Sequence, residues 1–209
     1  SWLGDFVQVD LPPRELAARL TLAGVEVESL HTIGDDWDKV FVGYVESVER
    51  HPNADRLNLV RVVAGEHHLT VVTGAPNIVQ GQKVPLALVG AEVWDGHSVE
   101  KKRLKLRPST IRGVPSEGMV CSEKELGLSE AAGDIIYLPD DTPVGVPLTK
   151  ILGDYVIDFE IKGPFGHLQS IYGIAREISA LYGRPLKRDP LTAAEAMGLQ
   201  VVSQAGAFE

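Results

Sequence analysis

The chain has a single cysteine, few aromatic residues and no long apolar run, and each shortage excludes a class of protein. With Cys121 alone, no disulfide can form within the chain, which fits a reducing compartment. No segment approaches the roughly 20 consecutive apolar residues that cross a bilayer. The first residues also lack the basic and apolar parts of a secretory signal. We therefore expect a cytoplasmic protein without membrane contact.

Positive charge is also in short supply. The chain carries 20 basic and 29 acidic residues, a formal net charge of −9. This balance argues against a protein that coats nucleic acid unselectively, so any RNA contact requires a local basic patch. Its 209 residues, 44% of them hydrophobic, are enough for one large domain or two small ones.

The middle of the chain has the pattern of a β-protein. Val, Tyr and Leu recur in short runs that Gly and Pro interrupt, which is typical of a sandwich or barrel. The predicted strands are 40–48, 57–63, 69–73, 83–89 and 91–94.

The sequence of each flank of this β-rich region predicts one helix and one strand. At the start, Pro12-Pro13 opens a helix that ends at Gly24, and an alternating strand follows over 25–28. Near the end, residues 156–161 alternate like a half-buried strand. A helix follows from about 170 to Gly183, and its predicted buried face comprises Ile171, Ile174, Ile178 and Leu181.

Each flank is too small to fold alone, so we expect the two to pack together, with the β-domain inserted between them. The predicted fold class is α+β. The predicted domains are a small split α/β domain (1–39 together with 151–190), a β-barrel domain (40–150) and a linker or the start of a further domain (191–209).

One stretch in the β-domain is strongly basic. If residues 101–107 form a strand, side-chain alternation places Lys101, Arg103, Lys105 and Arg107 on one face, about 7 Å apart. Leu104 and Leu106 then point to the core. A phosphate backbone is a natural partner for such a row of cations. The alternative is a solvated face, or an edge strand that charge protects from aggregation.

Two further segments have turn chemistry and polar side chains. Residues 51–57 (His-Pro-Asn-Ala-Asp-Arg-Leu) contain the residue types that form turns. Residues 112–127 begin with Arg112, a fifth candidate cation, and contain glycines typical of tight turns. Within them, Ser116 and Ser122 could contact sugar or phosphate. A bulged strand with one helical turn is the alternative explanation.

Signatures of catalysis are missing. The sequence has no Gly-x-x-x-x-Gly-Lys phosphate loop and no Gly-x-Ser-x-Gly elbow. Its six histidines lack the spacing of a metal site. Cys121 has no activating neighbour in sequence, so we expect a buried, inert thiol. The chain is not expected to be an enzyme on its own.

Three ordered motifs resemble the tRNA-binding OB-fold domain found in several translation proteins. They are residues 51–57, the Gly-Ala-Pro-Asn run at 74–77 with 83–85 after it, and residues 112–119 with 121–122 and 125–127. The resemblance implies an OB barrel whose loops face tRNA. Together with the basic stretch, it gives these candidate tRNA-binding residues: His51, Asn53, Arg56, Asn77, Lys101, Arg103, Lys105, Arg107, Arg112, Ser116, Met119 and Ser122.

The flanks are similar to the β subunit of bacterial phenylalanyl-tRNA synthetase, in residues 1–3, 22–28 and 173–178. This resemblance implies a non-catalytic N-terminal piece of an α2β2 ligase that charges tRNA with phenylalanine. Its implied partners are tRNA, the catalytic α subunit and later β domains. ATP and Mg²⁺ belong to the whole enzyme and no cofactor to this piece. Two alternatives stay open: a free-standing OB-fold tRNA-binding protein, and a protein-assembly module without RNA contact.

Overall fold

The computed structural model describes residues 2–96, 98, 100, 102–130 and 134–188. They fold as two compact units. One comprises the segment up to His31 and the segment from Tyr155 onward, and the other is Thr32–Asp154. Within the described residues, no helix combines the length and hydropathy needed to cross a membrane. The predicted linker at 191–209 lies outside the described residues.

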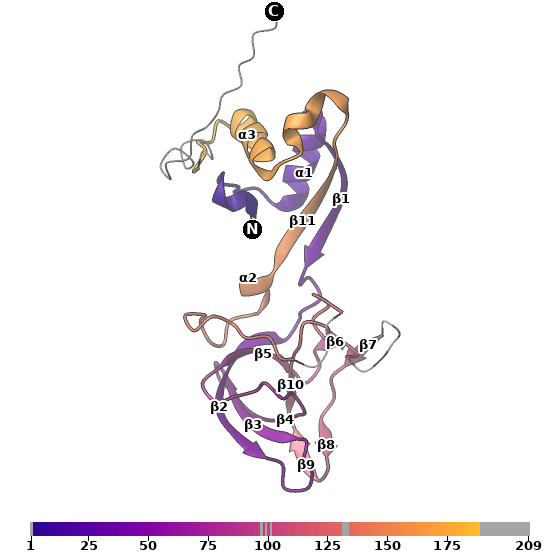
Figure 1. The fold of residues 1–209 in the computed structure, drawn as a ribbon, viewed down its shortest axis with the longest axis vertical. Helices are drawn as coiled ribbons and strands as arrows, with labels where there is room; N and C mark the ends of the chain where they lie inside the picture. Colours follow the sequence, from indigo (N-terminus) through magenta and orange to yellow (C-terminus); the bar gives the residue numbers. More distant parts are fainter. Residues whose placement is uncertain (1, 97, 99, 101, 131–133, 189–209) are drawn as a thin grey trace, which may run out of the picture. The chain divides into compact units, whose positions relative to one another are not determined.

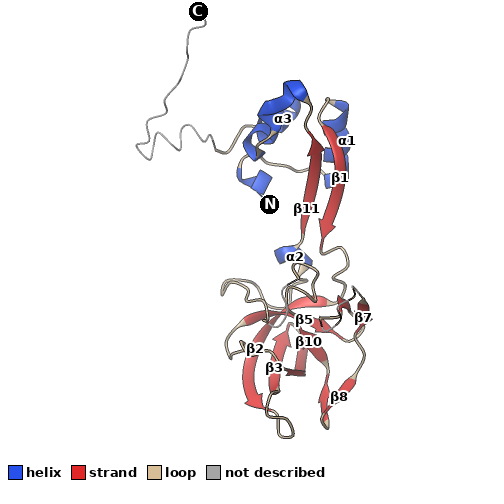
Figure 2. Ribbon diagram, turned by 45° about the vertical axis from the view of Figure 1, so that its right-hand side comes forward, coloured by secondary structure: helices blue, strands red, loops and turns tan. Residues whose placement is uncertain are grey.

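Helices lie in the two flanks of the chain, and strands fill its middle (Figures 1 and 2). The helices, with η for 3-10 turns, are η1 (Trp2–Asp5), α1 (Pro13–Leu22), α2 (Thr149–Leu152), η2 (Gly163–Leu168) and α3 (Ile171–Tyr182). The strands are β1 (Glu26–Ile33), β2 (Val40–Arg50), β3 (Asn58–Ala64), β4 (His67–Thr73), β5 (Lys83–Leu88), β6 (Glu92–Trp94), β7 (Arg103–Lys105), β8 (Ser109–Ile111), β9 (Val114–Ser116), β10 (Gly118–Val120) and β11 (Asp154–Glu160).

The Thr32–Asp154 unit is a five-stranded antiparallel barrel. Its strands follow the order β10-β5-β2-β3-β4. The ends of this order meet where the Glu117 N–H donates to the Thr70 carbonyl (3.0 Å) and the Val72 N–H donates to Ser116 Oγ (3.1 Å). This nearly closed barrel confirms the predicted OB fold and α+β class.

Side chains along β2 and β3 point alternately to the interior and to solvent, and the inward ones fill the barrel. Val60 and Val62 point inward with no exposed surface, while Arg61 between them faces solvent. Gly43 allows close packing, because a Cβ there would lie 2.5 Å from Val62 Cγ1. The interior side chains form one core cluster, whose largest fully buried member is Leu86.

A second core cluster forms around Trp37 in the same unit and includes Val93, Cys121, Leu126 and Leu148. The Trp37 Nε1 donates to the Leu126 carbonyl (3.0 Å), which satisfies its one polar atom in a buried site. Segments that follow β5 and β10 therefore pack as a second layer on the barrel.

The other unit packs α1, η2 and α3 around Leu16, Leu20, Ile174 and Ile178. Ser170 caps α3 by accepting from the Gly173 N–H (3.0 Å), and Gly183 ends it in the left-handed conformation. The predicted inner face of this helix is right at Ile174 and Ile178. It is wrong at Ile171 and Leu181, 38% and 43% exposed, because no described residue covers the two ends of the stripe.

Candidate nucleic-acid interface

Residues 51–57 hold the β8–β9 hairpin in place. His51 is buried, and its Nδ1 accepts from the Asn53 N–H (3.0 Å). The proton therefore sits on Nε2, which donates to the Ile111 carbonyl (3.0 Å). Asn53 Nδ2 donates to the Arg112 carbonyl (2.9 Å). The first and third of the three family-like motifs are thus linked by side chains of residues 51–53 and backbone carbonyls of residues 111 and 112.

The hairpin turn presents a cation to solvent. Strands β8 and β9 pair from Ser109↔Ser116 to Ile111↔Val114, which leaves Arg112 and Gly113 as a two-residue loop. Their φ values of 49° and 89° are typical of the type I′ turn that fits the twist of a hairpin. Arg112 is exposed at the tip of the hairpin.

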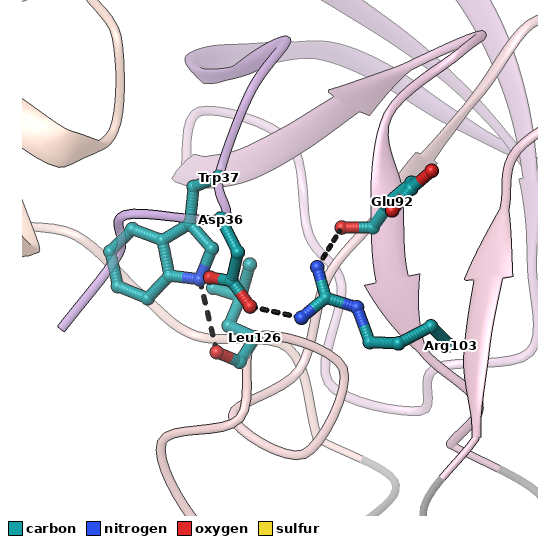
Figure 3. Close-up of polar contacts among 5 residues, drawn as sticks. All are labelled: Asp36, Trp37, Glu92, Arg103 and Leu126. Carbon is teal, nitrogen blue, oxygen red and sulfur yellow. Dashed lines mark hydrogen bonds and ion pairs between the residues drawn. The ribbon is translucent and has the colours of Figure 1, made fainter. Parts of the chain in front are cut away.

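Arg103 is held at the protein surface by several groups (Figure 3). Its guanidinium forms an ion pair with Asp36, donates to the Glu92 carbonyl (3.4 Å) and lies 4.9 Å from the centroid of the Trp94 ring. The sequence gives no signal for Asp36 or Trp94 as partners of this arginine, since Asp36 precedes it by 67 residues. Arg103 ties the β6–β7 ladder to the segment before β2.

Lys105 and Arg107 have different surroundings from Arg103. Both side chains are exposed, and neither makes a hydrogen bond or ion pair with any described residue. The same holds for the side chains of Arg112 in the hairpin and Arg56 in residues 51–57. Four of the candidate cations are thus free, among the described residues, to meet a phosphate. Lys101 lies outside the described residues.

Three polar candidates use their hydrogen-bonding atoms within the fold. Ser116 Oγ, which accepts from Val72, donates to the Gly118 carbonyl (3.1 Å). Ser122 Oγ donates to Glu125 Oε2 (2.8 Å). Asn77 donates from Nδ2 to the Ile135 carbonyl and accepts the Ile135 N–H at Oδ1, both at 3.0 Å. These contacts position loops of the barrel.

The burial predicted for Leu104 is wrong. Leu104 lies opposite Val93, as alternation requires, but it is 47% exposed whereas Val93 is 2% exposed. Val93 packs into the Trp37 cluster, whereas Leu104 belongs to none of the three core clusters. Leu106 is partly buried against the Trp37 cluster, in agreement with its predicted inward direction.

The exposed leucine lines a groove of about 530 Å³. Val72 of β4, Met119 of β10 and Ile111 of β8 contribute to its lining, as do Lys105 and Arg107. The groove therefore brings together residues from the basic stretch, the hairpin and the barrel. Of the twelve sequence candidates it collects Lys105, Arg107, Ser116 and Met119.

The side chains that could bind a metal ion are dispersed in the part of the chain that the structure describes. No three His, Cys, Asp or Glu side chains there are placed to hold a metal ion. Burial raises the pKa of the Cys121 thiol far above its ordinary value, with the charge of Glu125 adding to the effect. The prediction of a buried Cys121 is confirmed, and the raised pKa keeps the thiol protonated.

The barrel matches a known family model. Residues 40–147 match the model described as "Putative tRNA binding domain". The chain belongs to this family. The match begins at the first residue of β2 and extends beyond β10, so it includes the groove, the hairpin and the free cations.

Curated relatives extend the likeness to both flanks. The chain is 48% identical over 183 residues to a phenylalanine–tRNA ligase β subunit from Dehalococcoides mccartyi, a match that covers 88% of this chain and 22% of the relative. The corresponding subunit from Syntrophus aciditrophicus is 43% identical over 188 residues, covering 89% and 22%. The resemblance to this β subunit is confirmed. The chain spans about a fifth of the length of these relatives.

Proposed function

We propose that this chain is the non-catalytic, tRNA-facing N-terminal part of a phenylalanine–tRNA ligase β subunit in the cytoplasm. It supports ATP-dependent charging of tRNA by an α2β2 enzyme, whose α subunit and later β domains are its protein partners. ATP and Mg²⁺ act elsewhere in that enzyme, and none of the chemical steps is assigned to this chain. The residues we assign to tRNA are Lys105, Arg107 and Arg112.

One observation carries this proposal: Lys105 and Arg107 line a groove of an OB barrel in a tRNA-binding family and lack partners among the described residues. Arg112 is equally unpartnered at the tip of the β8–β9 hairpin, whose Ile111 also lines the groove. OB folds bind nucleic acid with one face and with their loops, and these three cations lie in the long connection between the barrel strands β5 and β10. Phosphate contacts from Lys and Arg provide affinity without reading sequence. Specificity for one tRNA then comes from the rest of the enzyme.

The test compares two triple variants of the 209-residue chain. Lys105→Ala, Arg107→Ala and Arg112→Ala together are expected to weaken binding to total tRNA by about tenfold or more at low salt, since three phosphate contacts are lost. The control removes the same charge from exposed side chains outside the groove, with Arg14→Ala, Lys150→Ala and Arg176→Ala. Equal weakening by both sets would contradict the assignment. Absence of tRNA binding by the unmodified chain would favour a protein-assembly role.

A further inference from the structure

The groove beside the cations has an apolar floor that is open to solvent. Its aliphatic lining comprises Val72, Val89, Leu104, Leu106, Ile111 and Met119. Val89 is 37% exposed and Leu104 47% exposed, so large apolar side chains are left partly uncovered side by side in one concave site. Concave apolar surface with a few polar groups is typical of a site for a small ligand or part of a larger one.

The charged side chains that line the groove favour an anionic ligand. Of the described residues that line the groove, two are cationic, Lys105 and Arg107, and none is acidic. This is the reverse of the whole chain, which has 29 acidic and 20 basic residues. A fitting occupant therefore combines an apolar, flat or compact group with a negative charge next to it.

We propose that the groove binds an unpaired nucleotide of the RNA, with the face of its base on the apolar floor and its phosphate at Lys105 and Arg107. This inference rests on the proposed function and specifies it: the barrel recognises a single-stranded region and not a helix. A base within a duplex cannot present its face to the protein, because the neighbouring base pairs cover it.

The polar groups of the groove point to weak discrimination between bases. Ser116 Oγ already accepts one hydrogen bond and donates another within the fold. Base identity is read through hydrogen bonds to base edges, whereas contact with a base face is sequence-tolerant. The groove floor is mainly aliphatic, so we expect all four bases to bind with similar affinity.

The experiment uses three fluorescent probes with the 209-residue chain: a 12-nucleotide unstructured RNA, the same RNA with four central abasic riboses, and a blunt duplex of that sequence. The unstructured RNA is expected to bind a few-fold more tightly than the abasic one, because each base that lies on the floor removes apolar surface from water. The duplex is expected to bind no better than the abasic RNA.

A groove variant tests whether the base lies on the apolar floor. Leu104→Ala should weaken binding of the unstructured RNA by a few-fold and leave the abasic RNA unchanged. Val79→Ala, which truncates a side chain that is 54% exposed and is not in the groove, should affect neither. Thermal unfolding verifies that both variants remain folded.

The outcomes separate this inference from the proposed function. If tRNA binds but base-containing and abasic RNA bind equally, or if duplex binds as tightly as single strands, the inference is overturned and the tRNA-facing role stands. If neither tRNA nor any of the probes binds, both fail.

Discussion

At the residue scale, the two cations of the short strand β7, Arg103 and Lys105, have different roles. Arg103 contacts Asp36 and the Trp94 ring, whereas Lys105, two residues later, makes no hydrogen bond or ion pair with a described residue. Strand periodicity correctly places both on one face of β7. It cannot distinguish them, because the ion-pair partner of Arg103, Asp36, lies in a loop 67 residues earlier.

The first prediction concerns this difference. Arg103→Ala is expected to lower the free energy of unfolding by about 1–2 kcal/mol, since a partly exposed ion pair and a cation–π contact are lost together. Lys105→Ala should change it by less than about 0.5 kcal/mol. Denaturant unfolding of the two variants measures both values. Equal effects would show that Arg103 does not hold the β6–β7 ladder.

Two leucines provide a second prediction. Leu104→Ala should cost less than about 0.5 kcal/mol, because nearly half of the side chain is exposed. Leu86→Ala should cost about 2–5 kcal/mol, because Leu86 is fully buried in the barrel. A large loss of stability in the Leu104 variant would mean that this side chain is covered in solution.

Cys121 gives a prediction about pH. Its folded pKa is raised by burial, so the folded state disfavours the thiolate. The stability linked to the protonated thiol is therefore complete below the ordinary thiol pKa of about 8.5 and declines as the pH rises above it. At pH 8 the native thiol should resist alkylation and react promptly once denaturant is added. Rapid alkylation of the native chain would contradict its burial.

At the scale of elements, the barrel strands β2 to β5 were predictable, whereas the barrel strand β10 and the β8–β9 hairpin were not. The strands β2 to β5 follow from β-branched runs and the glycines between them, with bounds that differ from the predicted ones by one or two residues. In residues 109–116, only the Arg112-Gly113 pair suggests a turn. The two strands on either side of it have three residues each, too few for a clear alternating pattern. Their position depends on His51 and Asn53, about 60 residues away, a contact that local pattern cannot reveal.

The hairpin turn supplies the element-scale prediction. Gly113→Ala should destabilise the chain by about 1–2 kcal/mol, since a side chain disfavours the left-handed conformation found there. Gly74→Ala is the control, because its φ is not positive and a Cβ would make only ordinary contacts. The Gly113 variant should also bind tRNA less tightly than the control, since the turn carries Arg112. Equal stability of the two variants would contradict the type I′ geometry.

At the scale of the whole molecule, an acidic protein presents a small basic site. The net charge of −9 disfavours general binding of RNA, and our proposal assigns the local attraction of RNA to Lys105, Arg107 and Arg112. The sequence alone identified these cations as candidates, together with polar residues that the structure uses internally. Composition and periodicity indicate where charge lies along the chain, but only the folded arrangement shows which charges are already paired.

The most direct test of this account is the affinity of the 209-residue chain for tRNA over salt concentrations from about 50 to 200 mM. Neutralisation of three phosphates predicts that log K falls with log[salt] at a slope of about −2 to −3. The variant lacking Lys105, Arg107 and Arg112 should show a slope near zero. A slope that is unchanged in this variant, or no binding at the lowest salt, would contradict the claim that these cations form the tRNA-facing site.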